Sequence, residues 1–263
     1  MTAAAFSLVI TALILPTFIR LTSHVRLARV NFTGRTLPSG TGLAVVMGAG
    51  TGTLLATLAG DYCPDLALAL LVVLAGFGLV GLVDDVAGEV GIKGWKGHLR
   101  SLLEEARLTT GGLKVLFGVV VALTVAVFVG GNRLDVGINA GLMAVGAATL
   151  NQLDTKPARA VAGFLAFTAL AALAGGTAVL RAAAPVVGAV LAYLPYDAGA
   201  RAMLGDSGSN PLGAALGLAL VRLPLPVRVA ALAILVVLHV AGEVTSLDRL
   251  LAAGAPGREG GQG

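Results

Sequence analysis

Long apolar runs, separated by short charged or glycine-rich segments, occupy most of this chain. An α-helix needs about 20 apolar residues to cross the hydrocarbon core of a bilayer. Six runs come near this length and the last three are shorter; in order, the nine are 1–19, 36–60, 66–83, 115–132, 136–153, 160–180, 182–196, 207–221 and 229–242. The short runs are spans that tilt little, spans whose end residues snorkel to the interface, or broken helices that line a cavity, where irregular backbone is tolerated. The pattern predicts an all-α, polytopic integral membrane helix bundle with about nine to ten transmembrane helices.

The composition agrees with this interpretation. Hydrophobic residues make up 57% of the 263 residues and charged residues only 12%, whereas soluble domains carry roughly 25% charged residues. Because the apolar runs are evenly spread, we expect one transmembrane catalytic domain over residues 1–251, followed by a flexible Gly-rich tail over 252–263. The single cysteine, Cys63, excludes an internal disulfide and a multi-cysteine metal site.

The basic residues predict the orientation of the chain. If the connections between runs alternate across a membrane, 14 of the 18 Lys and Arg residues fall in one set of connections, and only Arg133, Arg181, Arg222 and Arg228 fall in the other. Cytoplasmic connections carry the excess of positive charge. We therefore expect a plasma-membrane protein with its N-terminus outside, its C-terminus inside and its basic connections cytoplasmic. The basic excess is then a signal of topology, and nucleic acid is not an expected partner.

Three polar clusters follow or precede apolar runs, and all fall on the predicted cytoplasmic face. They are Asp84-Asp85, the segment Asn151 to Asp154, and the segment Gly205 to Ser209 (Gly-Asp-Ser-Gly-Ser). Two acids at the C-terminal end of a helix sit against the negative end of its dipole, and each raises the pKa of the other. Such a pair favours a positive ligand, most simply a divalent metal or a phosphate–metal complex, although a solvated pair that closes a helix fits the pattern as well.

These clusters, in this order, resemble the polyprenyl-phosphate N-acetylhexosamine-1-phosphate transferase superfamily, which includes phospho-N-acetylmuramoyl-pentapeptide transferase. The resemblance also covers segment 31–34 (Asn-Phe-Thr-Gly) and segment 37–42 (Leu-Pro-Ser-Gly-Thr-Gly), and runs to about residue 246. It implies transfer of a sugar 1-phosphate from a UDP-amino sugar to an undecaprenyl-type polyprenyl phosphate, with release of UMP. It further implies a requirement for Mg²⁺ and a role in cell-envelope polysaccharide or peptidoglycan synthesis.

Within that reaction we expect Asp206 to be the metal ligand, because Mg²⁺ takes one or two carboxylates and fills its shell with water and phosphate oxygens. The glycines around Asp206 would let backbone N–H groups approach a phosphate. By analogy with the family, Asp84 and Asp85 are the catalytic acids, with Asp84 acting on the lipid phosphate. The expected substrate-binding residues are Asn151, Asp154, Lys96, Gly205 and Ser207.

Several of these residues have simpler explanations. Asn151 and Asp154 would also serve as helix caps, because Asp154 stands shortly before Pro157. Lys96 belongs to a segment, residues 86–113, that reads as an amphipathic surface helix, and its lysines would equally meet anionic membrane lipids. His239 shares a helix face with Glu243, and we expect a packed residue rather than a catalytic one.

Two departures from the family pattern keep other functions open. The family often has a further acid three residues after the position of Asp154, where this chain has Pro157, and the C-terminal region is short. The alternatives are a catalytically inactive member that acts as an envelope-assembly scaffold or regulator, and an unrelated ion-coupled transporter. A transporter should carry its acids in the middle of spans, whereas these acids lie at span ends. The sequence leaves open whether two copies pair as a homodimer.

Overall fold

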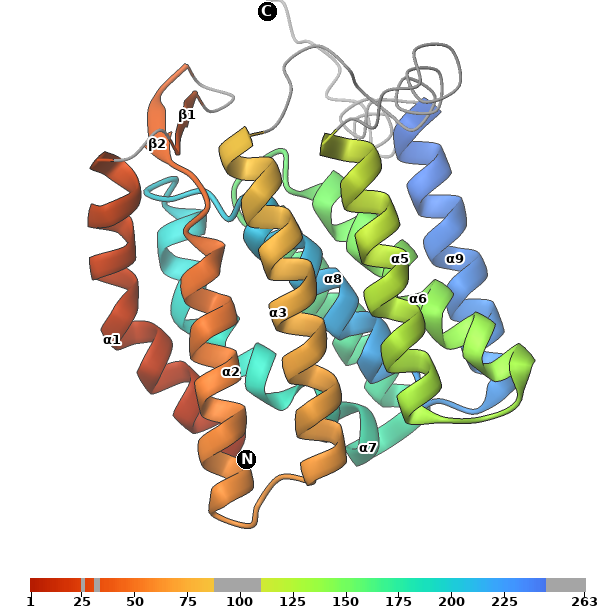
Figure 1. The fold of residues 1–263 in the computed structure, drawn as a ribbon. Coiled ribbons are helices and arrows are strands. Elements are labelled where there is room, and N and C mark those ends of the chain that lie inside the picture. Colours follow the sequence, from red (N-terminus) through yellow and green to blue (C-terminus); the bar gives the residue numbers. More distant parts are fainter. Residues whose placement is uncertain (25–26, 31–33, 88–109, 245–263) are drawn as a thin grey trace, which may run out of the picture.

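The computed structural model describes residues 1–24, 27–30, 34–87 and 110–244, and these residues form eight helices and one two-stranded sheet. The helices run roughly parallel or antiparallel to one another in a single bundle (Figure 1). In chain order the elements are α1 (Thr2–His24), β1 (Ala28–Val30), β2 (Thr36–Pro38), α2 (Gly42–Leu58), α3 (Pro64–Ala87), α5 (Thr110–Val129), α6 (Arg133–Leu153), α7 (Arg159–Ala198), α8 (Asp206–Leu220) and α9 (Leu225–Val244).

Helix α7 reverses its direction at Gly176. Its 40 residues are interrupted there by a non-helical backbone with φ 57° and ψ −139°. A straight helix of this length would extend about 60 Å, yet the residues just before α7 and those at its end line one small cavity. The two halves of α7 therefore run antiparallel to each other, and Gly176 supplies the positive φ that the turn between them requires.

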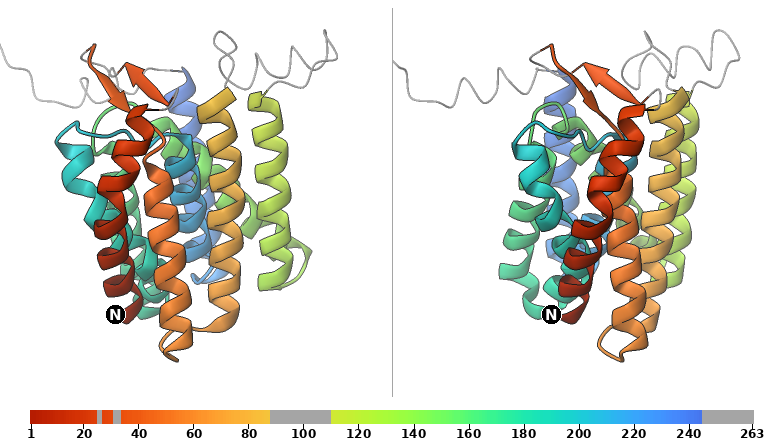
Figure 2. Two further views of the ribbon diagram at one scale, coloured as in Figure 1. Left: turned by 60° about the vertical axis from the view of Figure 1, so that its left-hand side comes forward. Right: turned by 90° about the vertical axis from the view of Figure 1, so that its left-hand side faces the viewer.

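The bundle has two polar ends. One end, here called the hairpin end, carries the antiparallel pair β1 and β2, from which it takes its name. The same end carries the C-terminal ends of α1, α3, α6 and α9, and the starts of α2, α5 and α8 (Figures 1 and 2). The opposite end, here called the far end, carries the start of α1 and the connections α2–α3, α5–α6 and α8–α9. Of the basic residues that the structure describes, Arg133, Arg181, Arg222 and Arg228 lie toward the far end and the others toward the hairpin end. The described part of the chain thus divides its basic residues between two ends as the alternation predicted.

Helix α8 lies at the centre of the bundle. All its residues from Ser207 to Leu220 are buried, and α6, α3, α7 and α2 pack around it. The contact with α6 is made by backbone: a Cβ on Gly146 would lie 2.5 Å from the carbonyl oxygen of Gly213, and one on Gly217 would lie 2.4 Å from that of Leu142. Small residues allow two helices to approach this closely.

The expected count of nine to ten spans is not supported. In the described residues, five helices are long and apolar enough to cross a membrane: α1, α3, α5, α7 and α9. Helices α2 and α8 have only 17 and 15 residues, and α6 interrupts its apolar sequence with polar residues such as Asp135 and Asn139. The predicted runs 160–180 and 182–196 both fall within α7, whose break at Gly176 lies inside the first run and not between the two. An apolar run shorter than a bilayer is often a buried core helix, and α8 is such a helix.

The all-α prediction is confirmed for the bulk of the chain, with one addition. Strands β1 and β2 pair antiparallel, with Arg29 opposite Leu37 and Val30 opposite Thr36. Strand β1 lies within the first predicted connection and β2 at the start of the predicted run 36–60, and these three-residue strands are too short to give an alternating pattern in the sequence. The ribbon that they form extends from the bundle at the hairpin end (Figure 2).

Candidate functional site

A carboxylate at the end of α3 holds the loop that begins α8. The two oxygens of Asp85 accept hydrogen bonds from the backbone N–H groups of Asp206 and Ser207, each at 2.9 Å. The side chain of Asp154 accepts a third hydrogen bond, from the N–H of Gly205 at 3.1 Å. Three consecutive N–H groups of the loop, here called the 205–207 loop, are therefore bound to carboxylates. The prediction that these N–H groups contact phosphate does not match their hydrogen bonds in this structure.

The glycines around this loop allow its close packing. Gly205 has φ +71°, and a Cβ there would lie 2.7 Å from the backbone nitrogen of Gly40 and 2.8 Å from Asp85 Oδ2. A Cβ on Gly81, in the last turns of α3, would lie 2.1 Å from the carbonyl oxygen of Asp206. These positions need glycine for conformation at Gly205 and for space at both. Ser207, which is fully buried, directs its hydroxyl to the carbonyl oxygen of Gly40 at 3.4 Å.

Lys114, near the start of α5, lies between two carboxylates from different helices. Its ammonium group contacts Asp206 Oδ2 and lies 3.4 Å from Asp84 Oδ2. All three side chains are partly exposed, at 19% for Lys114, 24% for Asp84 and 26% for Asp206. The cluster is thus reachable from the hairpin end, and its described members are two acids and one base.

Asn151, in the last turn of α6, joins this cluster. In the amide orientation that pairs each donor with an acceptor, the Asn151 nitrogen donates to Asp206 Oδ1 at 3.0 Å and to Ser209 Oγ at 2.8 Å. The amide oxygen then accepts from Lys114 Nζ at 3.1 Å. Asn151 therefore orients both the acid and the base of the cluster. The backbone N–H of Asp154 closes the same helix, so the C-terminal cap role and the site role coexist on this turn. The predicted N-terminal cap role of Asp154 is wrong, because α7 begins at Arg159 with Ala158 as its N-cap.

Burial raises the pKa of two acids of the site, Asp206 and Asp154. It raises the pKa of Asp206 to about 6, and the adjacent Lys114 ammonium opposes this rise. Burial also raises the pKa of Asp154 well above its ordinary value, with a further contribution from the nearby carboxyl of Asp197. Any further cation beside Asp206, in addition to Lys114, would favour the charged form of the Asp206 carboxyl.

Comparisons of the sequence with protein-family models and with curated proteins find no match. The resemblance to the transferase superfamily stays a prediction, and the geometry is the basis for the interpretation of this site.

The structure brings most of the predicted site residues together. Asp84, Asn151 and Asp206 surround Lys114, while Asp85, Asp154, Gly205 and Ser207 build the loop that positions Asp206. Lys96 lies outside the described residues, as does most of the predicted surface helix. The predicted clusters that stand far apart in the sequence therefore meet at the hairpin end.

Two basic residues of the site were not singled out from the sequence. Lys114 is the charged residue at the head of an apolar run, and that position was its only signal. Arg29, on β1, donates from Nη2 to the carbonyl oxygen of Asp85 at 2.9 Å and so reaches the C-terminal end of α3. The unpredicted ribbon thus contributes a guanidinium beside the acid pair.

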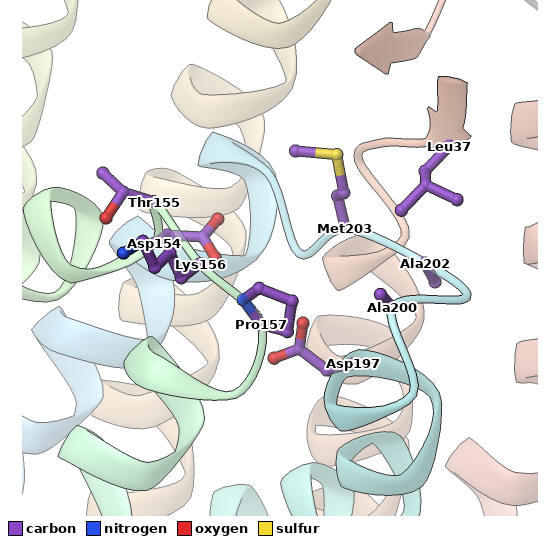
Figure 3. Close-up of a pocket in the computed structure, with 9 residues that line it drawn as sticks. All are labelled: Leu37, Asp154, Thr155, Lys156, Pro157, Asp197, Ala200, Ala202 and Met203. Carbon is purple, nitrogen blue, oxygen red and sulfur yellow. The ribbon is translucent and has the colours of Figure 1, made fainter. Parts of the chain in front are cut away.

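A small cavity adjoins the 205–207 loop, on its Asp154 side (Figure 3). Its volume is about 30 Å³, roughly the space of one water molecule. The α6–α7 connection, the end of α7 and the segment before α8 form its walls, together with Leu37 of β2. One oxygen of Asp197 is buried here with no hydrogen-bond partner in the described structure. The cavity therefore offers a buried acceptor next to the loop.

Proposed function

We propose that this protein transfers a sugar 1-phosphate from a UDP-amino sugar to a polyprenyl phosphate in the membrane and releases UMP. The observation that carries the proposal is the meeting of Asp84, Lys114, Asn151 and Asp206, from four different helices, at one end of an apolar bundle. The motif resemblance supports the same reaction, because its polar segments are the ones that contribute to this cluster.

The donor set of the cluster fits a magnesium ion. In the part of the chain that the structure describes, no group of three or more His, Cys, Asp and Glu side chains could share a metal. Mg²⁺ needs only one or two carboxylates, since water and substrate phosphate complete its shell. Asp206 and Asp84 converge on one cation, the Lys114 ammonium, so both already face a single positive charge. We assign Asp206 as the residue that would hold Mg²⁺, which would neutralise charge on the phosphates.

The chain's own residues then have distinct roles. Transfer of a phosphoryl group between two anions depends mainly on positioning and on charge stabilisation. An oxygen of the lipid phosphate attacks the phosphorus bonded to the sugar, and the bond from that phosphorus to the UMP oxygen breaks. Lys114 stabilises the negative charge on the phosphates, and Asp84 orients the lipid phosphate. Asp85 and Asp154 hold the 205–207 loop, so that Asp206 stays in place.

The hairpin end is, in this proposal, the cytoplasmic end. It holds most of the described basic residues, and cytoplasmic connections carry the positive excess. The start of α1, at the far end, is then outside. The five long apolar helices would keep the cluster at the membrane surface, where a lipid phosphate and a soluble nucleotide sugar can meet.

The test is an assay of UMP release. Purified protein is incubated with undecaprenyl phosphate, Mg²⁺ and either UDP-GlcNAc or UDP-MurNAc-pentapeptide. We expect UMP from one of these donors, no product after chelation of Mg²⁺, and recovery when Mg²⁺ is restored. Asp206→Asn should abolish turnover. A well-folded protein that releases no UMP from any UDP-amino sugar would exclude the transferase and favour the scaffold.

A further inference from the structure

A second and larger cavity lies at the far end of the bundle, opposite the proposed catalytic cluster. Its volume is about 600 Å³, within the range of small-molecule sites. The start of α1, the α2–α3 connection, the second half of α7 and the α8–α9 turn form its walls. None of the residues assigned to catalysis contributes to it. The cavity is therefore separate from the transferase site and does not depend on the proposed function.

Positive charge dominates this cavity. Among the described residues that line it are two arginines, Arg181 of α7 and Arg222 of the α8–α9 turn, and one acid, Asp61. Neither guanidinium group makes a hydrogen bond or an ion pair within the described structure. Their neighbour Arg228 behaves differently, because it donates to Asp135 and Asn139 at 2.7 Å each. The far end thus neutralises one arginine and leaves two facing the cavity.

The walls of the cavity are held together by contacts between elements. The buried Tyr62 donates from its hydroxyl to the carbonyl oxygen of Ala182 at 3.1 Å, which ties the α2–α3 connection to α7. A Cβ on Gly188 would lie 2.0 Å from the carbonyl oxygen of Ala4, so α1 and α7 meet backbone to backbone. Burial raises the pKa of Tyr62, and Arg222 is close enough to oppose that rise. The cavity is preformed, and little ordering free energy is lost when a ligand enters.

We propose that the far-end cavity binds an anionic phosphate group, either the headgroup of a phospholipid or free phosphate. Guanidinium groups match phosphate oxygens in geometry and charge. The lining is also part apolar, through Leu66 of α3 and Ala184 of α7. The cavity lies beside the starts of α1 and α3 and the turn within α7. Because α1 and α3 are long enough to cross a membrane, a cavity at their ends lies at the depth of lipid headgroups.

The test measures binding to the full chain, purified in a zwitterionic detergent. Isothermal titration calorimetry is carried out with phosphatidylglycerol, phosphatidylcholine and inorganic phosphate as the three probes. The double variant R181Q/R222Q removes the positive charges of both arginines that line the cavity. The matched control is Arg133→Gln, because Arg133 is an exposed arginine at the same end and does not line this cavity. Asp61→Asn removes the opposing negative charge, and a variant that merely damages the fold would not strengthen binding.

We expect the double variant to lose affinity by about tenfold or more, Arg133→Gln to change it by less than about twofold, and Asp61→Asn to raise it by at least about twofold. Tighter binding of phosphatidylglycerol than of phosphatidylcholine, without binding of inorganic phosphate, assigns the site to lipid headgroups. Binding of inorganic phosphate that competes with the lipid assigns it to the phosphate group itself. The proposal is wrong if neither anion binds, if R181Q/R222Q binds like the wild type, or if Arg133→Gln loses as much.

Discussion

The ammonium group of Lys114 contacts the carboxylate of Asp206 although 92 residues separate them in the sequence. The same ammonium lies 3.4 Å from Asp84 Oδ2. One cation therefore joins the end of α3, the start of α5 and the start of α8. This relationship makes Lys114 the centre of the candidate site and Asp84 and Asp206 its acidic partners.

Substitution of Lys114 should remove most of the transferase activity. Lys114→Met keeps the length of the side chain and removes its charge, so that developing negative charge on the phosphates loses a fixed cation. We expect kcat to fall by about 10²–10³-fold, as when one stabilising group of an active site is removed. UMP release measures the effect. Arg20→Gln, which changes an exposed cation on α1 at the same end, is the control, and a loss below tenfold for Lys114→Met would remove Lys114 from the catalytic cluster.

The two adjacent acids of α3 should respond differently to the same substitution. Asp84→Asn leaves the 205–207 loop intact, and we expect activity to fall by about 10²-fold or more with little change in Tm. Asp85→Asn places an amide N–H against backbone N–H groups that now donate to a carboxylate. We expect it to lower the free energy of unfolding by about 1–3 kcal/mol. Thermal unfolding and UMP release separate the two effects, and equal Tm losses would contradict this division of roles.

The sequence predicts a helical bundle well because its apolar runs are long and bounded by charges. It predicts the number of spans poorly, because an apolar run such as that of α8 looks the same whether lipid or protein surrounds it. Helix α8 is buried along almost its whole length by other helices, and no property of the run alone distinguishes the two environments.

The sequence also identifies the acids of the site more readily than it identifies their roles. Asp84 and Asp85 are identical and adjacent in sequence, but successive residues of a helix point in different directions. One meets Lys114 and the other meets the 205–207 loop. Lys114 was missed because a single basic residue at the head of a span is normally a sign of topology. Its role depends on a contact between α5 and α8 that no local pattern encodes.

Gly205 should not tolerate a side chain, even a methyl group. Gly205→Ala meets two costs: a positive φ of +71° and a Cβ within 3 Å of Gly40 and Asp85. Gly130→Ala is the matched control, because Gly130 has φ +86° with no atom within 4 Å of its would-be Cβ. The control should lose about 1–2 kcal/mol of stability from backbone strain alone.

Crowding at Gly205 should cost roughly a further 1–3 kcal/mol, together with a loss of activity as Asp206 is displaced. Thermal unfolding of both variants under the same conditions gives the difference. If the two variants are equally stable, the 205–207 loop adapts to a side chain and does not fix Asp206.

Asp154, which accepts a hydrogen bond from Gly205 of the 205–207 loop, should make the stability of the protein depend on pH. Its pKa in the folded protein is raised well above the ordinary value by burial and by Asp197, so the unfolded chain binds fewer protons than the folded one between the two pKa values. Stability therefore falls as pH rises from the unfolded pKa, about 3.9, toward the folded one. Asp154→Asn keeps an oxygen that can accept from the N–H of Gly205 but cannot lose a proton. The variant should gain stability relative to the wild type as pH rises, and Tm measured at pH 5 and pH 8 tests this. If the difference in Tm between Asp154→Asn and the wild type is the same at pH 5 and pH 8, Asp154 does not titrate in this range.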